Sequence, residues 1–388
     1  MTHAVIVDAV RTATGKGKPG GALSGVHPVD LFATTLRALA DRTGLDPATL
    51  DDVVGGCVTQ TGEQTFNVTR NAVLAAGFPE SVPGVTIDRQ CGSSLQALQF
   101  AAALVISGVQ DVVIAGGVES MSRAPMFSSL VGKDPRGPMV NARYPEGLVD
   151  QGISAELIAA RWGFTREQLD EFAAASHEKA AAAQKEGLFA DEIVPVGGHA
   201  TDELVRPGTT VEKLAGLNAA FRSDELAARF PEIGWCITAG NSSPLTDGAS
   251  AALVMSQERA AQLGLTPRAR ILATAAVGSD PLLMLTGVIP ATEKVLAKAG
   301  LTIDQIDAYE VNEAFAPVPM AWARDVHADP ERLNIRGGAI AIGHPLGGTG
   351  TKLVSTLLRV LEGTGGRTGL VAICEGGGMA NAMVIERL

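Results

Sequence analysis

The chain has 388 residues, of which 46% are hydrophobic but only 4% aromatic, and it contains 45 glycines. This length and composition predict two or more tightly packed α/β lobes and exclude a disordered chain. The formal net charge of −11, without any run of basic residues, argues against a nucleic-acid-binding surface.

The cysteine pattern favours a reducing compartment. Four cysteines lie far apart and show no metal-ligand spacing, namely Cys57, Cys91, Cys236 and Cys374. A chain of this size does not need disulfides for stability. The sequence shows no secretory signal and no apolar run of roughly 18–20 residues that could span a membrane. We therefore expect a soluble cytoplasmic protein that binds neither metal nor membrane.

Strands and helices are expected to alternate at the start of the chain. In order, the pattern predicts a strand over 4–10, a helix over 27–43 closed by Gly44, a strand at 53–54, a helix near 67–76, a strand over 85–87, a helix after Cys91, and a strand over 112–115 that ends in Gly116-Gly117. This alternation predicts a mainly parallel sheet covered by helices.

The texture changes between residues 119 and 245, where loops rich in Pro, Gly and Met surround an Ala/Glu-rich helical stretch over 154–186. We interpret this segment as an insertion. The α/β pattern resumes with a strand over 249–255, and a second series of elements runs from residue 269 to the end.

The second series resembles the first. Residues 44–54 align without gaps on residues 300–310, and each is followed at a similar distance by a turn that opens a long helix. Two similar half-chains are therefore expected, packed so that the equivalent turns face each other. The alternative is a chance similarity between two αβ units.

The first of these turns carries Cys91, between an apolar strand and a helix. A thiolate there would accept helix N-terminal N–H groups and feel the positive end of the helix dipole, which lowers a thiol pKa. The position suits a nucleophile. The alternative is a buried, unreactive cysteine, since free cysteine is among the most buried residue types.

The second turn is a glycine-rich segment, residues 337–350, that contains His344. Its spacing does not fit a phosphate-binding loop. A histidine between Gly343 and Pro345 on a rigid turn has little core to pack into, although a structural role is the alternative.

Two further polar positions follow predicted strands. Cys374 ends the strand over 370–373, and the Asn312-Glu313 pair ends the strand over 308–311, where open α/β sheets place ligands. Two cysteines, a histidine and an asparagine on such turns suit acyl transfer through a thioester, which needs a nucleophile, a proton carrier and oxyanion stabilisation.

At this point the sequence resembles the thiolase family, which comprises acetyl-CoA acetyltransferases and 3-ketoacyl-CoA thiolases. The matching motifs span nearly the whole chain: Arg11-Thr12, Gln90-Cys91-Gly92-Ser93, Gly116-Gly117-Val118-Glu119-Ser120-Met121-Ser122, Arg206-Pro207-Gly208-Thr209-Thr210, Thr238-Ala239-Gly240-Asn241-Ser242-Ser243, Asn312-Glu313-Ala314-Phe315, Gly343-His344-Pro345 and Cys374-Glu375-Gly376-Gly377-Gly378.

The resemblance implies a duplicated, five-layered αβαβα fold. Residues 1–118, completed by 246–267, would form the N-terminal half, residues 119–245 an inserted loop domain covering coenzyme A, and residues 268–388 the C-terminal half. It also implies a homodimer or homotetramer.

The resemblance further implies roles for five residues. Cys91 would be the acylated nucleophile, His344 its activating base, and Cys374 the acid/base for the second substrate. Asn312 would hold a water that stabilises the thioester oxygen together with His344. The backbone N–H groups of Cys91 and Gly376 would form the oxyanion hole.

Substrate contacts are expected from four more positions, namely Ser243 on the pantetheine arm and Gln151, Met284 and Phe315. No cofactor is implied, because coenzyme A is a substrate. Gln151 stands where short-chain members carry methionine, so it would alter the acyl wall unless it points into solvent. Two more departures from the family pattern are Asn218-Ala219, near the nucleotide, and Arg336, for which only a local turn contact is expected.

Several functions remain in competition. A decarboxylating ketoacyl synthase would show a Cys-His-His pattern, whereas this chain offers Asn312 and Cys374. A non-catalytic acyl-CoA-binding protein would have lost a catalytic position. Thiolysis of 3-ketoacyl-CoA, as in fatty acid β-oxidation, and condensation of two acetyl-CoA use the same residues, and the residues around Cys374 and Gln151 favour thiolysis.

Overall fold

The computed structural model describes residues 3–388, and its elements follow the predicted order in most places. The strands are β1 (Ala4–Thr12), β2 (Gly15–Lys16), β3 (Asp52–Gly56), β4 (Val85–Ile87), β5 (Val112–Ser120), β6 (Ile193–Val194), β7 (Thr246–Ser256), β8 (Ala269–Gly278), β9 (Ala308–Val311), β10 (Thr368–Glu375) and β11 (Met379–Arg387). The α-helices are α1 (Pro28–Thr43), α2 (Val68–Ala75), α3 (Ser93–Ser107), α4 (Gly137–Arg143), α5 (Gln151–Trp162), α6 (Arg166–Lys185), α7 (Val211–Ala215), α8 (Asp224–Arg229), α9 (Gln257–Gln262), α10 (Val288–Ala299), α11 (Pro317–Asp325), α12 (Ala339–Ile342) and α13 (Thr349–Thr364).

The sheet is mixed, so the prediction of a mainly parallel sheet is wrong. Its strands follow the order β4-β3-β5-β7-β1-β8-β11-β10-β9. Along this order only the outer pairs are parallel, β4 with β3, β3 with β5, and β10 with β9. The short β6 lies outside this order and pairs in parallel with β1. The inner pairs are antiparallel, because β7 enters between β5 and β1 and β11 returns beside β10 through a tight hairpin.

The predicted repeat is confirmed by the strand pairing. The series β3-β5-β7-β1 in the first half and β9-β10-β11-β8 in the second show the same sequence of one parallel and two antiparallel pairs. Gly44 and Gly300, equivalent in the alignment, both cap their helix in the left-handed conformation that glycine adopts without steric cost. The halves join where β1 pairs briefly with β8.

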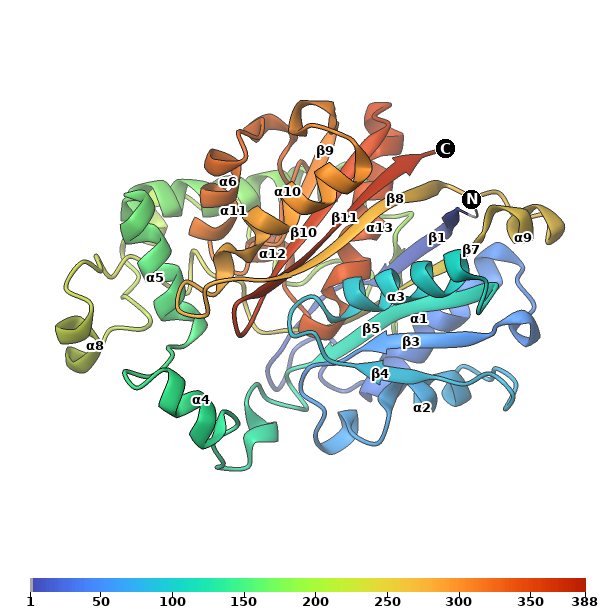
Figure 1. The fold of residues 1–388 in the computed structure, drawn as a ribbon, viewed down its shortest axis with the longest axis horizontal. Coiled ribbons are helices and arrows are strands. Elements are labelled where there is room, and N and C mark those ends of the chain that lie inside the picture. Colours follow the sequence, from blue (N-terminus) through green and yellow to red (C-terminus); the bar gives the residue numbers. More distant parts are fainter. Residues whose placement is uncertain (1–2) are drawn as a thin grey trace.

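Helices lie on both faces of the sheet and between its halves (Figure 1). α1 and α2 pack on one outer face, α10 and α11 on the other, and α3 and α13 pack against each other in the middle. The five layers expected of a duplicated αβαβα fold are therefore present. The central layer is apolar, with Leu95, Leu98, Leu357 and Leu361 fully buried.

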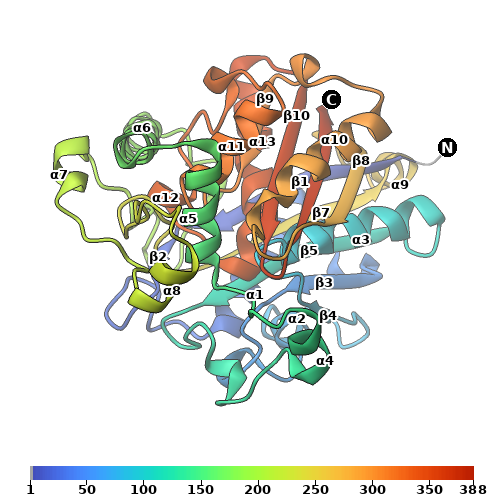
Figure 2. The ribbon, with the colours of Figure 1, turned by 60° about the vertical axis from the view of Figure 1, so that its left-hand side comes forward.

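The segment between β5 and β7 lies mostly beside one end of the sheet, where α5, α6, α7 and α8 gather (Figure 2). The helical stretch predicted over 154–186 is two helices, because Gly163 ends α5 in the left-handed conformation and Thr165 begins α6 with a capping box. α5 packs on α11 and α6 on α12. β5 does not end at Gly116-Gly117 as predicted but continues to Ser120, since both glycines pair with β7.

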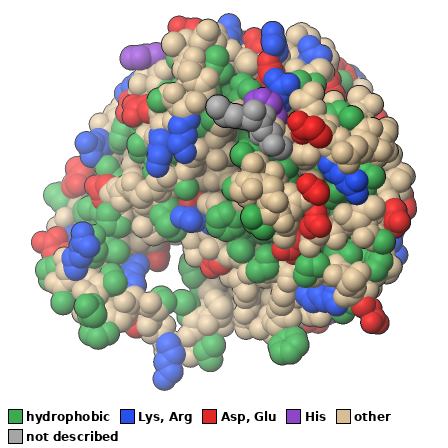
Figure 3. Space-filling model, turned by 45° about the vertical axis from the view of Figure 1, so that its right-hand side comes forward, with side chains coloured by type: hydrophobic (Ala, Val, Ile, Leu, Met, Phe, Trp, Pro, Cys, Tyr) green, Lys and Arg blue, Asp and Glu red, His purple; other side chains and the backbone are tan. Residues whose placement is uncertain are grey.

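On the face shown in Figure 3, acidic and basic side chains are interspersed rather than gathered by sign. Over the described part of the chain, no helix is both long and apolar enough to cross a bilayer.

Candidate active site

Cys91 lies on the turn between β4 and α3, as predicted, and the turn is fixed by its own polar groups. The backbone N–H of Arg89 donates to Ser93 Oγ at 2.9 Å, and this hydroxyl donates to the carbonyl of Gln90 at 2.6 Å. Gln90 has a φ of 50°, which is uncommon for a residue with a side chain. Such strain is typical of functional turns, where neighbouring contacts hold it in place.

The expected lowering of the Cys91 pKa is wrong for this structure. Burial raises the pKa of the thiol to about 12. The Gln151 amide and the N–H groups of Cys91 and Gly376 lower it by less, and a negative charge on Glu375 raises it further. Desolvation disfavours the thiolate more than the start of a helix stabilises it. The resting nucleophile is therefore a thiol, and its activation needs a base.

His344 lies on the equivalent turn of the second half and is held at three points. Its backbone N–H donates to Thr246 Oγ1 at 3.0 Å. Its ring Nδ1 lies 2.6 Å from Thr349 Oγ1, and its Nε2 lies 3.3 Å from Asn312 Nδ2. Burial lowers the pKa of His344 to about 3, and the charge of Lys352 acts in the same direction. The imidazole is therefore neutral at physiological pH.

The hydroxyl of Thr349 selects one tautomer of that neutral ring. Its single proton is donated to the Pro345 carbonyl at 2.9 Å, so towards His344 it can only accept. Nδ1 then carries the ring hydrogen, and the lone pair of Nε2 faces the Asn312 amide NH₂ at 3.3 Å. The arrangement makes Nε2 the nitrogen that can accept a proton.

The two turns face each other, as the repeat predicted. The backbone N–H of Thr351 donates to Ser94 Oγ at 3.2 Å. The Cα of Gly350 lies so close to the Leu95 backbone that any side chain would collide with it. The starts of α3 and α13 are therefore packed directly together.

Cys374 is the last residue but one of β10 and lies near Cys91. Burial raises the pKa of its thiol well above the usual range, and the nearby Cys91 and Glu375 raise it further. The N–H of Gly376, directly beyond the strand, points at the Cys91 sulfur. An N–H beside the nucleophile's sulfur lies where it could also reach the oxygen of a carbonyl group that this sulfur attacks.

Asn312 and Glu313 follow β9 and are both buried, but they differ in how their polar atoms are satisfied. Glu313 accepts hydrogen bonds from Ser176, Asn334 and the Ile340 backbone at 2.7, 2.8 and 3.1 Å. Asn312 Oδ1 has no partner within the described residues. An unpaired buried acceptor beside the His344 ring suits a bound water.

Gln151 is the first residue of α5 and turns its amide towards the nucleophile. Its Nε2 lies 4.0 Å from Cys91 Sγ, and the side chain is partly buried. The alternative that Gln151 points into solvent on a mobile loop is therefore wrong.

The remaining predicted substrate residues lie around the Asn312 turn. The backbone N–H of Ser243 donates to the Ala314 carbonyl at 2.9 Å, beside Phe315. Met284 and Phe315 belong to the apolar cluster that contains Cys374. Ser242 and Pro244, on either side of Ser243, border a small cavity of about 30 Å³.

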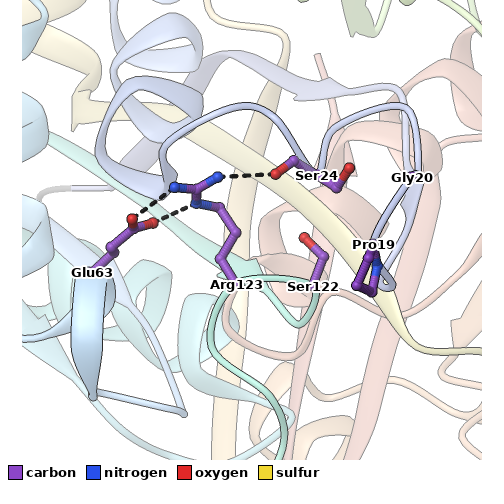
Figure 4. A pocket seen from close by; sticks show the side chains of 6 residues that line it. All are labelled: Pro19, Gly20, Ser24, Glu63, Ser122 and Arg123. Carbon is purple, nitrogen blue, oxygen red and sulfur yellow. Dashed lines mark hydrogen bonds and ion pairs between the residues drawn. The ribbon is translucent and has the colours of Figure 1, made fainter.

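A larger open cavity of about 360 Å³ contains none of the predicted residues and is lined by Pro19, Gly20, Ser24, Glu63, Ser122 and Arg123 (Figure 4). The Arg123 guanidinium donates hydrogen bonds to the Glu63 carboxylate and, at 3.0 Å, to the Ser24 carbonyl. Its charge is already paired, so nothing there marks a ligand site.

Sequence reasoning missed the roles of Thr349, Thr246 and Glu375. A hydroxyl five residues after His344, at the start of a helix, was the available signal for Thr349.

Arg336 makes more than the expected local turn contact, since it donates to the carbonyls of Leu188 and Arg359 at 2.7 and 2.8 Å and joins the insertion to α13.

Comparisons with known proteins identify the family of the chain. A sequence model of the thiolase N-terminal domain matches residues 4–258, and one of the thiolase C-terminal domain matches residues 265–387. The chain is 48% identical to the steroid 3-ketoacyl-CoA thiolase FadA6 of Mycobacterium tuberculosis, over all of this chain and 95% of that protein. It is 45% identical to a 3-ketoacyl-CoA thiolase of an Enterobacter species over the full length of both. The structure resembles an acetyl-CoA acetyltransferase of Bacillus anthracis, with a TM-score of 0.89, 37% identity, and coverage of 100% of this chain and 99% of that one.

Proposed function

This chain belongs to the thiolase family, and from that premise we propose that it cleaves 3-ketoacyl-CoA with coenzyme A, giving acetyl-CoA and a shortened acyl-CoA. The observation that carries the proposal is that two buried thiols, Cys91 and Cys374, lie near enough to raise the pKa of Cys374, with the Gly376 N–H near the first sulfur. One thiol can hold the acyl group while the other moves a proton.

The first half-reaction would begin with proton transfer from Cys91 to His344 Nε2. The sulfur attacks the 3-keto carbon, and the N–H groups of Cys91 and Gly376 stabilise the oxyanion. The bond between C2 and C3 then breaks. The leaving enolate of acetyl-CoA takes a proton at C2 from Cys374, and a water held by Asn312 and His344 stabilises its oxygen.

The second half-reaction would reverse these proton movements. The Cys374 thiolate takes the proton of the incoming coenzyme A thiol, whose sulfur attacks the acyl-Cys91 thioester. Collapse of the tetrahedral intermediate releases the Cys91 sulfur, which recovers its proton from His344. Each thiol returns to its starting state, so the reaction is reversible and needs no metal or redox cofactor.

Four finer assignments belong to the same proposal. We place the enzyme in fatty acid β-oxidation, as a homodimer or homotetramer in the cytoplasm. The four buried cysteines, none in a disulfide, support a reducing compartment. Ser243, Gln151, Met284 and Phe315 are proposed to contact the substrate.

Two variants test the assignment of the thiols. We expect Cys91→Ser to abolish turnover, since a hydroxyl lacks the accessible anionic form of a thiol. Cys374→Ala should still be acylated but turn over little, because proton transfer at the substrate α-carbon is lost. Mass spectrometry after exposure to acyl-CoA should find the added mass on the Cys91 peptide, with Cys57 and Cys236 unmodified. Acyl mass on another peptide, or normal activity of Cys91→Ser, would refute the proposal.

A further inference from the structure

A group of unpaired oxygens lies behind the nucleophile. Glu375 Oε1 and Oε2 and Asn381 Oδ1 are buried and have no hydrogen-bond partner within the described residues. Glu375 follows Cys374 at the end of β10, and Asn381 lies in β11. Buried polar atoms are nearly always hydrogen-bonded, and each exception lowers stability, so three unpaired acceptors together require an explanation.

Two of these oxygens border the same point beside Gly92. Asn381 Nδ2 donates to the Gly92 carbonyl at 3.1 Å, which fixes the amide and leaves Oδ1 on the other side. Asn381 Oδ1 and Glu375 Oε1 both lie within 2.7 Å of the point that a Cβ on Gly92 would occupy. Two buried acceptors beside one point, neither with a donor among the described residues, are stabilised if one of them carries a hydrogen for the other.

We propose that Glu375 is a neutral carboxylic acid that donates its proton to Asn381 Oδ1. It is a positioning residue, because the chain Glu375–Asn381–Gly92 ties the strand that carries Cys374 to the turn that carries Cys91. The inference deepens the proposed function, since it rests on Cys91 being the nucleophile.

The charges around Glu375 agree with this protonation state. Burial raises the pKa of Glu375 to about 8, Arg89 opposes this and Asp88 adds to it. Cys91 and Cys374 are the other titratable groups that face it. Above pH 8 the proton would pass to solvent, which breaks the link to Asn381. The new negative charge would disfavour the Cys91 thiolate.

The test measures the rate at which iodoacetamide alkylates Cys91 between pH 6.5 and 9.5, with the modified peptide assigned by mass spectrometry. In the wild type we expect this rate to rise up to about pH 8 and then flatten. In Glu375→Gln, whose amide stays neutral and can still donate to Asn381 Oδ1, the rate should keep rising and exceed the wild type by threefold or more at pH 9.5. Alkylation needs no acyl-CoA, so it separates failure of this inference from failure of the thiolase assignment.

Glu310→Gln is the matched control, because burial also raises the pKa of Glu310 to about 8 but the carboxyl faces Lys352 rather than the thiols. It should keep the flattened profile. As the pH is raised, the infrared spectrum of Glu310→Gln should still lose a protonated-carboxyl band with a midpoint near pH 8. This measurement does not require that Glu375→Gln folds. Identical alkylation profiles in the wild type and Glu375→Gln, or the absence of that band, would overturn the proposal.

Discussion

His344 shows how neighbouring side chains determine what one residue can do. Its pKa of about 3 keeps the ring neutral, so its own protonation does not limit activity near neutral pH. The Thr349 hydroxyl determines which ring nitrogen carries no hydrogen, and Asn312 faces that nitrogen. The ability of the ring to accept a proton therefore depends on Thr349 and Asn312, which form no covalent bond with the substrate.

Replacing Thr349 tests this tautomer control. We expect Thr349→Val to lower kcat by about 10–100-fold with little change in KM, by analogy with the loss that follows removal of a group that orients a metal-bound histidine. Thr349→Ser should restore most of the activity, since it keeps the hydroxyl. Nitrogen-15 NMR of the histidines should show the Nδ1–H form in the wild type and a mixture in Thr349→Val. An unchanged tautomer and kcat would refute the role.

Gln151 is expected to set acyl-chain preference from its position 4.0 Å from the Cys91 sulfur. Gln151→Met should shift the ratio of kcat/KM for short over longer 3-ketoacyl-CoA by roughly tenfold, within the 1–3 kcal/mol that a pocket contact can discriminate. Cys91 acylation by acetyl-CoA should change little. Gln262→Met, on the exposed surface of α9, is the control. A constant ratio across a series of chain lengths would assign chain length to another part of the pocket.

At the scale of elements, the buried carboxylate of Glu119 joins three segments. It accepts N–H groups from Val58 and Thr59 after β3 at 3.0 Å, from Gln64 at 2.9 Å, and from Gly347 beyond His344 at 2.9 Å. A Cβ on the neighbouring Gly117 would collide with the Gly347 carbonyl, so this close approach requires glycine there.

Glu119→Gln should destabilise the protein and impair catalysis together. The amide would place an NH₂ group against N–H donors, losing charge-assisted bonds worth roughly 1.5–3 kcal/mol each. We expect the free energy of unfolding to fall by about 3 kcal/mol and kcat to fall with it, since the turn that holds His344 loses its anchor. Denaturant unfolding measures the first and a steady-state assay the second. Glu258→Gln on exposed α9 should change neither, and a fully stable Glu119→Gln would contradict the anchor.

At the scale of the molecule, Arg11 forms ion pairs that connect the sheet to the segment between β5 and β7. Its fully buried guanidinium in β1 contacts Glu192 at 2.5 Å and Asp202 at 2.7 and 2.9 Å, and both carboxylates lie in the segment between β5 and β7. The ring of Phe189, from the same segment, lies 5.1 Å from the guanidinium. Removing one partner would leave a buried charge unpaired.

This pairing predicts a stability that is lost in acid. Burial acts to raise the pKa of Asp202, but the charge and hydrogen bonds of Arg11 outweigh it and hold the pKa below 3.8. The carboxylate therefore contributes stability that is present above pH 3.8 and disappears as the pH falls through the lowered pKa. Asp202→Asn should lower the free energy of unfolding at pH 7 by about 3–5 kcal/mol.

The measurement is unfolding as a function of pH, followed by circular dichroism. Asp202→Asn should lose less stability than the wild type between pH 5 and 2, because it lacks the titrating group. Asp41→Asn, on the exposed side of α1, should behave as the wild type. A wild-type acid profile for Asp202→Asn would refute the contribution of this pair.

The sequence alone determined the local elements and their repetition. Helix α1 with its Gly44 cap, the turns of Cys91 and His344, and the alignment of residues 44–54 with 300–310 follow from periodicity and capping, which depend on neighbours in the chain. Motif resemblance supplied the family and the roles of the site residues, and those roles, like the domain boundaries, stay predictions.

Only the tertiary structure decided strand direction, protonation and pairing. β7 lies antiparallel between β5 and β1 because the insertion returns the chain to the middle of the sheet, which no local pattern shows. Cys91 has a raised rather than a lowered pKa because burial by distant residues outweighs the start of its helix. Glu375 and Asn381, on the two strands of one hairpin, both lie beside Gly92, which is far from them in the sequence. Desolvation and contact depend on what surrounds a residue in space, whereas the sequence directly records only what adjoins it along the chain.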